Sequence, residues 1–113
     1  MLEKKIESDA VKGVKKWGEK LGVELSVVKM NPRGNRSWPD RTFLWGEGNT
    51  LLVEYKQPGK APTKLQKDKH EELRRLGFEV LVHDNAEQSI REITARISAT
   101  IRADRSNEKD NAG

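Results

Sequence analysis

Asp40, Glu54 and Lys56 have the residue types and the spacing of a small catalytic group. The two carboxylates are equidistant from Glu47, which lies at the centre of a segment with the pattern of a β-hairpin. In an antiparallel strand pair such residues lie opposite each other, with Cβ atoms about 4.5–5.5 Å apart. Lys56 follows Glu54 by two residues and therefore leaves the same face of the sheet. We expect these three charged side chains to converge.

Two carboxylates at this separation repel each other, and one pKa rises unless a cation lies between them. A hard divalent cation such as Mg²⁺ binds oxygen ligands, usually one or two carboxylates together with water and substrate phosphates. The pattern therefore favours a magnesium site. An ordinary solvated hairpin with a surface ion pair is the alternative, because a register slip of one residue would move Asp40 to the other face.

Hydrophobic periodicity predicts seven elements in the order α-β-β-β-α-β-α. Gly18 and Gly22 are expected to end the first helix, Gly46-Glu47-Gly48-Asn49 to form the hairpin turn, and Asn85 to cap the last helix. The expected ranges are residues 2–17, 23–30, 42–45, 51–55, 63–76, 78–82 and the segment that follows Asn85.

The second helix opens with the capping box Thr63-Lys64-Leu65-Gln66. Gln66 therefore has a purely structural interpretation, in which its side chain binds the Thr63 amide. His70 is expected at the surface of this helix, as neither ligand nor base. The residues expected to be buried are Leu65, Leu73 and Leu76.

The first and last helices each carry one apolar stripe. In the first, Ile6, Ala10, Val14 and Trp17 are expected to face the core, with Glu7 beside them. In the last, the isoleucines either cover the sheet or pair with a second copy of the chain. These isoleucines are Ile90, Ile93, Ile97 and Ile101.

The composition limits the classes of protein to which the chain can belong. The chain has 113 residues, 34% of them hydrophobic and 35% charged, so it is expected to form one domain with a thin core that dimerisation would help to stabilise. It contains no cysteine, and His70 and His83 lack ligand spacing, which argues against disulfides and zinc. Neither a membrane span nor a signal peptide is recognised, so we expect a cytoplasmic protein.

The net charge of +4 suits a polyanionic partner. The loop 31–37 carries two arginines, which either bind phosphates or belong to an ordinary surface loop. Trp38 either stacks on a base or joins the core. The residues expected to bind DNA are Arg33, Arg36, Arg41, Lys12, Lys16, Lys60 and Lys64.

Several motifs together resemble the VRR-NUC family, the compact branch of the PD-(D/E)xK nucleases. A bare PD…ExK pattern is weak, but here it is accompanied in order by flanking residues, which makes the resemblance fairly specific. It covers about residues 6–82 and rests on Glu7, Pro39-Asp40-Arg41, Val53-Glu54-Tyr55-Lys56, Pro58-Gly59 and Thr63-x-x-Gln66.

This resemblance implies metal-dependent hydrolysis of DNA phosphodiesters. Asp40, Glu54 and the Tyr55 carbonyl would hold Mg²⁺ or Mn²⁺, with Glu7 contributing directly or through water. Lys56 would orient the attacking water or help to deprotonate it, and Gln66 would steady the site or contact the substrate.

The implied fold is α/β, with a restriction-endonuclease-like αβββαβ core, a mixed sheet flanked by helices and an added C-terminal helix. Residues 1–102 would form the nuclease domain and residues 103–113 a polar, disordered tail. Stand-alone members of the family resemble junction resolvases, so the implied partner is branched DNA cut by a homodimer. The alternatives are a nuclease acting on flap, nicked or linear DNA, a non-catalytic DNA-binding module, and a structural protein with a basic surface.

Overall fold

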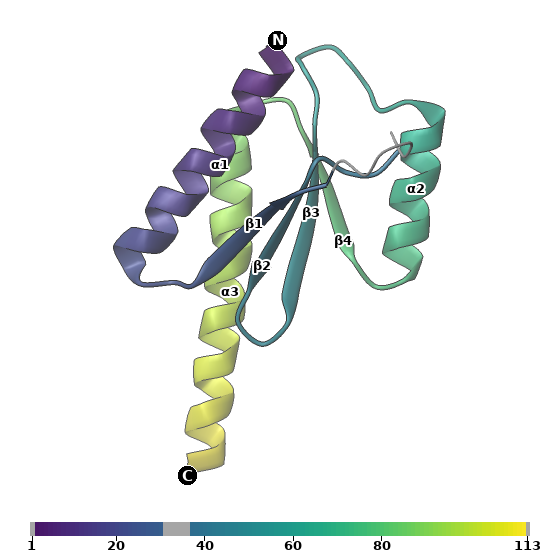
Figure 1. Cartoon of the computed structure of the whole chain (residues 1–113). Coiled ribbons are helices and arrows are strands. Elements are labelled where there is room, and N and C mark those ends of the chain that lie inside the picture. The colour runs from purple at the N-terminus through teal and green to yellow at the C-terminus, as the bar shows by residue number, and fades with distance from the viewer. Residues whose placement is uncertain (1, 31–36, 113) are drawn as a thin grey trace.

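The chain folds in the expected order αβββαβα. A computed structural model of the protein describes residues 2–30 and 37–112, with side chains through Ala103. Figure 1 shows the elements along the chain. They are α1 (Leu2–Leu21), β1 (Leu25–Lys29), β2 (Arg41–Trp45), β3 (Asn49–Tyr55), α2 (Lys64–Arg75), β4 (Glu79–His83) and α3 (Ala86–Ala112).

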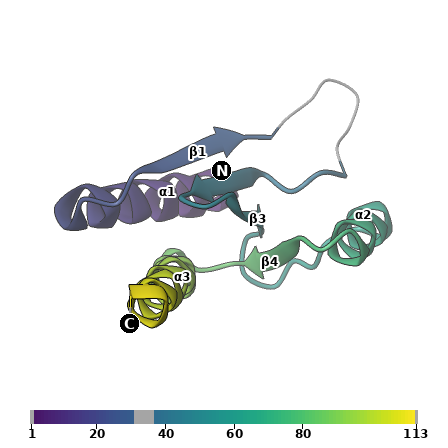
Figure 2. The same cartoon turned by 90° about the horizontal axis from the view of Figure 1, so that it is seen from below.

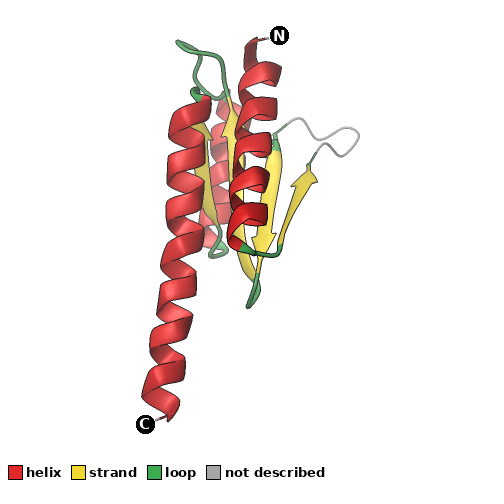
Figure 3. Ribbon diagram, turned by 90° about the vertical axis from the view of Figure 1, so that its left-hand side faces the viewer, coloured by secondary structure: helices red, strands yellow, loops and turns green. Residues whose placement is uncertain are grey.

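The four strands form one mixed sheet in the order β1-β2-β3-β4. β1, β2 and β3 are antiparallel neighbours, and β4 runs parallel to β3 after the crossover through α2. Helices α1 and α3 lie side by side over one face, and α2 lies against the other (Figures 2 and 3). The predicted mixed sheet flanked by helices is therefore confirmed.

The hairpin between β2 and β3 has the predicted centre. Arg41 pairs with Val53 and Trp45 with Asn49, so the register is symmetric about Glu47. Glu47 itself has a φ of 67°, in the left-handed region that tight turns use. Because this register is fixed by five residue pairs, Asp40 and Glu54 are the next residues in line beyond the last pair.

Successive side chains of β3 point to opposite faces of the sheet and so belong to two different layers. Leu51, Val53 and Tyr55 are fully buried in the main core beneath α1 and α3. Leu52 belongs to a smaller cluster with Leu73 of α2 and one residue of β4. Glu54 has the same parity as Leu52 and therefore leaves the sheet on the α2 side.

The isoleucine stripe of α3 packs inside the chain. Ile93 and Ile97 are fully buried in the main core, and Ile90 and Ile101 are partly buried against it. Gly13 lets α1 and α3 approach closely, because a Cβ at that position would lie 2.3 Å from Ile90 Cδ1. Of the two alternatives for this stripe, the structure shows the one in which it covers the sheet.

Two of the three leucines assigned to the buried side of α2 are exposed, which corrects the sequence prediction. Leu65 is 72% exposed and Leu76 69%, whereas Leu73 is 4% exposed. His70, predicted at the surface, is 2% exposed. The inner face of α2 thus follows the helical spacing of Gln66, His70 and Leu73, and its first two turns present polar groups to the sheet.

The helix boundaries also differ from the predicted ones. Gly18 is buried within α1, which continues to Leu21 and ends at Gly22, where φ is 70°. The backbone of α3 is helical through Ala112. The division into a domain of residues 1–102 and a polar tail stays a prediction. Within the described part of the chain, every helix is too short or too polar to cross a bilayer.

We predict that Ile97→Ala lowers the free energy of unfolding by about 2–5 kcal/mol, the usual cost of a cavity at a fully buried isoleucine. Ile101→Ala, at the partly buried end of the same stripe, is the matched control and should cost clearly less. Urea unfolding followed by circular dichroism measures both. Equal losses for the two variants would contradict the packing described for α3.

Candidate active site

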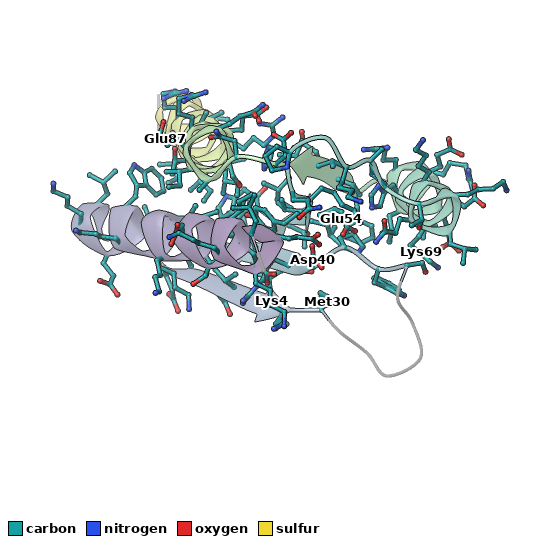
Figure 4. The ribbon with its side chains drawn as sticks, turned by 90° about the horizontal axis from the view of Figure 1, so that it is seen from above. Lys4, Met30, Asp40, Glu54, Lys69 and Glu87 are labelled. Atoms are coloured by element: carbon teal, nitrogen blue, oxygen red, sulfur yellow. The ribbon has the colours of Figure 1, made fainter. Side chains whose placement is uncertain are left out.

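Three carboxylates meet at the end of the sheet where β2 begins and β3 ends. One oxygen from each of Glu3, Asp40 and Glu54 lies within 4.8 Å of the others. Glu3 comes from the first turn of α1, Asp40 directly precedes β2, and Glu54 belongs to β3. Figure 4 looks onto this end of the molecule and shows Asp40 and Glu54 between the start of α1 and α2.

The backbone holds Asp40 in place from both neighbouring strands. Its Oδ2 accepts a hydrogen bond of 2.7 Å from the Tyr55 amide, and its carbonyl oxygen accepts one of 2.8 Å from the Met30 amide. The first bond points the carboxylate across the hairpin toward β3. The expected convergence of Asp40 with Glu54 is thus produced by strand pairing together with one side-chain bond.

Glu54 is 1% exposed and lies under the polar face of α2. Its Oε1 lies 3.4 Å from His70 Nε2, and its Oε2 lies 3.5 Å from Gln66 Nε2. Both separations are at the long end of hydrogen-bonding distance. Since residues four apart share one face of a helix, Gln66 and His70 reach the same carboxylate together.

Gln66 forms the predicted capping box and also faces Glu54, while its role in catalysis remains a prediction. The Thr63 hydroxyl accepts from the Gln66 amide, and the Gln66 side-chain oxygen accepts from the Thr63 amide at 2.9 Å, which completes the capping box. Its remaining side-chain group, the Nε2 amide, faces Glu54. The cap therefore fixes the orientation of the amide group that contacts the site.

Burial, followed by nearby negative charge, raises the pKa values of the central carboxylates. For Glu54, burial and then the charge of Asp40 raise the pKa to about 8, and the Lys56 ammonium opposes this rise. For Asp40, burial raises the pKa, against the lowering effect of the Tyr55 amide bond, while Glu7 and Glu3 add repulsion. At neutral pH, the protein without a bound cation keeps a proton on this group of carboxylates.

His70 contacts Glu54 as a neutral imidazole. Burial, followed by the nearby Arg74 and Lys56 charges, lowers the pKa of His70. A raised carboxyl pKa and a lowered imidazole pKa both oppose an ion pair, so the 3.4 Å contact joins two neutral groups when no cation is present. The neutral imidazole can accept a hydrogen bond from the protonated Glu54 carboxyl group.

Glu7 and Arg41, each assigned a role from the sequence, are joined in one half-buried ion pair. Arg41 Nε donates to Glu7 Oε2 at 2.5 Å, and the two side chains are 20% and 11% exposed. Glu3 lies one helical turn before Glu7 and is the α1 carboxylate placed with Asp40 and Glu54. The metal-binding role of Glu7 and the DNA-binding role of Arg41 remain predictions.

Tyr55 is anchored on the opposite face of the sheet. Its hydroxyl group lies 2.9 Å from Ser89 Oγ, which in turn lies 2.9 Å from His83 Nδ1, and His83 Nε2 lies 2.7 Å from Glu92 Oε2. This buried chain of polar groups ties β3 and β4 to α3. It holds the residue whose amide binds Asp40 and whose carbonyl is a predicted metal ligand.

The four lysines expected to bind DNA fall into two groups. Lys60 and Lys64 are exposed, in the loop after β3 and at the first residue of α2. Figure 1 shows this loop at the same end of the molecule as the start of α1. Lys12 and Lys16 are exposed on α1, about 13 and 20 Å along the helix axis from Glu3. Arg33 and Arg36 lie outside the described residues.

Sequence reasoning did not identify Glu3 or the buried position of His70. A helical signal existed for both, because Glu3 precedes Glu7 by four residues and His70 follows Gln66 by four. Trp38, for which core packing and base stacking were both considered, packs partly buried against the cluster of Leu52 and Leu73.

The donor set fits a hard divalent cation. Glu3, Asp40 and Glu54 offer only oxygen ligands, which Mg²⁺ and Mn²⁺ accept, and the raised pKa values show that the group is electrostatically unfavourable without a compensating charge. Burial of the three side chains differs, with Glu3 and Asp40 half-buried and Glu54 buried. One side of the group therefore remains open to water and to a substrate.

No protein-family model matches the chain. It is 36% identical over 87 residues to the "Putative nuclease p44" of Acyrthosiphon pisum secondary endosymbiont phage 1, an alignment that spans 77% of this chain and 87% of that protein. A solved structure described as a VRR_NUC domain superposes with a TM-score of 0.65 and 26% identity, covering 83% of this chain and 96% of the other. The chain belongs to the VRR-NUC family. It is thus a nuclease by family, and the sheet and helices described above are the restriction-endonuclease-like fold expected from the motifs.

We predict that the stability of the metal-free protein falls as pH rises. The pKa of Glu54 is about 8 in the folded protein against an ordinary 4.5, so between these values the folded state retains a proton that the unfolded state has lost. The free energy of unfolding therefore decreases from pH 4.5 to about pH 8 and then levels off. Thermal melts in EDTA across this range measure the slope.

Glu54→Gln should remove most of this slope, because it removes the carboxyl group whose pKa rises on folding. The matched control is Glu19→Gln, an exposed carboxylate on α1 away from the site, which should leave the slope unchanged. Adding Mg²⁺ at pH 8 should raise the melting temperature of the wild type more than that of Glu54→Gln. A slope that Glu54→Gln leaves intact would show that the titrating group lies elsewhere.

Proposed function

We propose that this chain is a metal-dependent endonuclease that hydrolyses phosphodiester bonds of DNA. The observation that carries the proposal is the group of three carboxylate oxygens from Glu3, Asp40 and Glu54, within 4.8 Å of one another. Lys56 stands two residues beyond Glu54, and its charge acts on Glu54 and His70. Membership of a nuclease family supports the reaction class.

In this proposal, Asp40 and Glu54 bind Mg²⁺ or Mn²⁺, together with the Tyr55 carbonyl. Glu3 takes the position of the third carboxylate, directly or through water, because it is the α1 side chain that reaches the other two. Glu7 acts one step away: it pairs with Arg41 and so fixes the start of α1 against β2. When bound, the metal would lower the pKa of the attacking water and place positive charge beside the phosphate.

The protein's own groups then position and stabilise the reacting atoms. The Lys56 ammonium orients the attacking water and offsets the charge that develops on the phosphate. Gln66 and His70 hold Glu54 from the α2 side, so that its carboxylate keeps one orientation. The Tyr55 amide does the same for Asp40. The result is a preorganised site that needs little rearrangement during the reaction.

The finer substrate proposal is branched DNA, cut by a homodimer in the manner of a junction resolvase. A two-fold dimer suits a substrate with two equivalent strands. The buried isoleucines of α3 are used within the chain, so the dimer interface would lie on another surface. Flap, nicked and linear DNA remain the alternative substrates, and the exposed Lys60 and Lys64 would serve the phosphate backbone in each case.

A non-catalytic DNA-binding module with the same fold is the second candidate function. The basic net charge of +4 would suffice for it. This candidate does not explain the three clustered carboxylates, which would repel the phosphates of bound DNA. Metal-dependent cutting separates this candidate from the nuclease.

We predict that Asp40→Asn, Glu54→Gln and Lys56→Met each reduce cleavage by about 10²-fold or more, because each removes a group that acts on the reacting phosphate. Labelled four-way junctions and matched linear duplexes, incubated with Mg²⁺, Mn²⁺ or EDTA, give the rates. Lys12→Ala is the control and should only weaken binding, lowering its salt slope by about one. Cutting that persists in EDTA would contradict the proposal.

The pair Glu3→Gln and Glu7→Gln tests which α1 carboxylate serves the metal. Glu3→Gln should raise the Mg²⁺ concentration needed for half-maximal cleavage, with little change in melting temperature. Glu7→Gln should lower the melting temperature, because it removes the charge that compensates the half-buried Arg41. The reverse pattern would assign the metal to Glu7 and leave Glu3 as a surface residue.

For the homodimer, we expect light scattering to give about twice the 12.9 kDa chain mass at assay concentrations. Ile101→Ala should leave that mass unchanged, because this isoleucine packs against the core of its own chain. If light scattering gives the mass of one chain under conditions where junctions are cut, the dimer proposal is refuted. The nuclease proposal is unaffected by that result.

A further inference from the structure

The end of β3 beside the carboxylates is held at three points. Tyr55, the last residue of the strand, donates its amide hydrogen to Asp40 Oδ2 at 2.7 Å. The next amide, that of Lys56, donates to the carbonyl oxygen of His83 on β4 at 2.9 Å. The third point is the Tyr55 hydroxyl group, which lies 2.9 Å from Ser89 Oγ of α3. The peptide between Tyr55 and Lys56 is therefore held from both sides of β3 and, through the tyrosine side chain, from a helix.

The first two bonds set the direction of the Tyr55 carbonyl group. A residue of a strand directs its N–H and C=O groups to the same side, so this carbonyl points with its amide toward the Asp40 side. The trans peptide agrees, because the Lys56 N–H points to β4 and the carbonyl oxygen of the same peptide plane lies opposite. Continuing the register of β2 and β3 places Pro39 opposite Tyr55. Since proline has no N–H, the strand ladder offers this carbonyl no donor at that position.

A buried chain of polar groups continues from the Tyr55 hydroxyl. Ser89 Oγ lies 2.9 Å from His83 Nδ1, and His83 Nε2 lies 2.7 Å from Glu92 Oε2, off the line of a hydrogen bond. The order serine, histidine, carboxylate also occurs in hydrolase active sites. Here, however, Ser89 is 0% exposed, so its hydroxyl group cannot reach a substrate. The chain therefore acts within the protein.

The donors and acceptors of this chain have one consistent direction. An ionised carboxylate only accepts hydrogen bonds, so the His83 nitrogen that faces Glu92 is the one that carries a proton. Burial lowers the pKa of His83, so its ring is neutral at neutral pH and Nδ1 accepts from the Ser89 hydroxyl. Ser89 has a single proton to donate, so the Tyr55 hydroxyl in turn donates to Ser89. Ser89 thus connects the tyrosine to the histidine whose carbonyl holds the next amide.

Side-chain anchoring takes over where the strand ladder stops. We propose that Ser89 is a positioning residue of the metal site, acting through the Tyr55 hydroxyl on the peptide between Tyr55 and Lys56. That peptide carries the carbonyl predicted to bind the metal, and the lysine that follows is the predicted catalytic cation. The inference rests on the proposed nuclease function for the role of Lys56. Its effect on the carbonyl concerns metal binding, which is measured without DNA.

A purely structural tie between α3 and the sheet is the competing interpretation. The protein contains a second bond of that kind, from Trp45 Nε1 to Thr100 Oγ1 at 2.7 Å. Trp45 is the last residue of β2, whereas Asp40 precedes the first, so this bond lies at the opposite end of the strand from the carboxylates. Both bonds join the same helix to the sheet. Loss of either one should have the same consequences if the tie is only structural.

The first experiment compares Tyr55→Phe with Thr100→Val, because each removes one hydroxyl group and keeps the shape of the side chain. Thermal melts in EDTA measure what each bond contributes to stability. Binding of Mn²⁺ without DNA is measured from the electron paramagnetic resonance signal of the free ion. We expect Tyr55→Phe to weaken Mn²⁺ binding about tenfold, as for other groups that hold a metal ligand, and Thr100→Val to leave it unchanged. Unchanged binding by Tyr55→Phe, or equal weakening by both variants, would overturn the proposal.

A double-mutant cycle determines whether Ser89 acts through the tyrosine. Ser89→Ala leaves two buried partners unpaired, so it should lower the melting temperature more than Tyr55→Phe does. Its effect on Mn²⁺ affinity should be close to that of Tyr55→Phe, and the double variant should bind Mn²⁺ as weakly as either single variant. Affinity losses that add in the double variant would refute the route through the hydroxyl group. If Ser89→Ala does not fold, the comparison of Tyr55→Phe with Thr100→Val still decides.

Cleavage assays separate this proposal from the nuclease itself. Mn²⁺ binding that depends on the Tyr55 hydroxyl, in a protein that cuts no DNA with any metal, would retain the positioning role and refute the nuclease. DNA cleavage by the wild type, with Tyr55→Phe equal to it in Mn²⁺ affinity and in rate, would do the reverse. If both proposals hold, a higher Mn²⁺ concentration should restore part of the cleavage rate of Tyr55→Phe. A wild type that binds no Mn²⁺ would refute both.

Discussion

Three carboxylates lie close together at one end of the sheet, and this arrangement is electrostatically unfavourable. The surrounding structure has to hold them there. Burial raises the pKa values of Asp40 and Glu54, the charge of Asp40 raises that of Glu54 further, and Glu3 adds a third carboxylate. Nothing in this arrangement favours folding by itself. It persists because strand pairing fixes Asp40 and Glu54, and because the backbone amide of Tyr55 holds one Asp40 oxygen. The rest of the fold supplies the stability that this site removes.

The two faces of the sheet differ in how much apolar surface they bury, because one face supplies the stability and the other carries the carboxylates. Helices α1 and α3 bury the main core, in which Val14, Phe43, Leu51, Ile93 and Ile97 are fully covered. Helix α2 contributes one buried leucine, and the polar residues of its first two turns, Gln66 and His70, contact Glu54. Because the α2 side is only partly covered, it also has room for a substrate. The main core stabilises the protein on one face of the sheet, and the candidate active site lies on the other.

The two acidic residues at the start of α1 illustrate how neighbours decide a role. Glu3 and Glu7 lie on the same side of the helix, one turn apart. Arg41 compensates Glu7 and ties α1 to β2, whereas Glu3 lies with the other carboxylates. The two residues have the same type and lie on the same side of α1, so what distinguishes their surroundings is a single arginine on the adjacent strand, which pairs with Glu7.

The sequence by itself determined the order of elements, the centre of the hairpin and the pairing of Asp40 with Glu54, because these depend on local turn chemistry and on the two-residue period of strands. It also identified the capping box, which is formed within four consecutive residues. Only the tertiary structure decided that His70 is buried and that Glu3 reaches the site. Both depend on how a helix is rotated against the sheet, and that rotation is set by packing between segments distant in the chain, which a helical period alone leaves open.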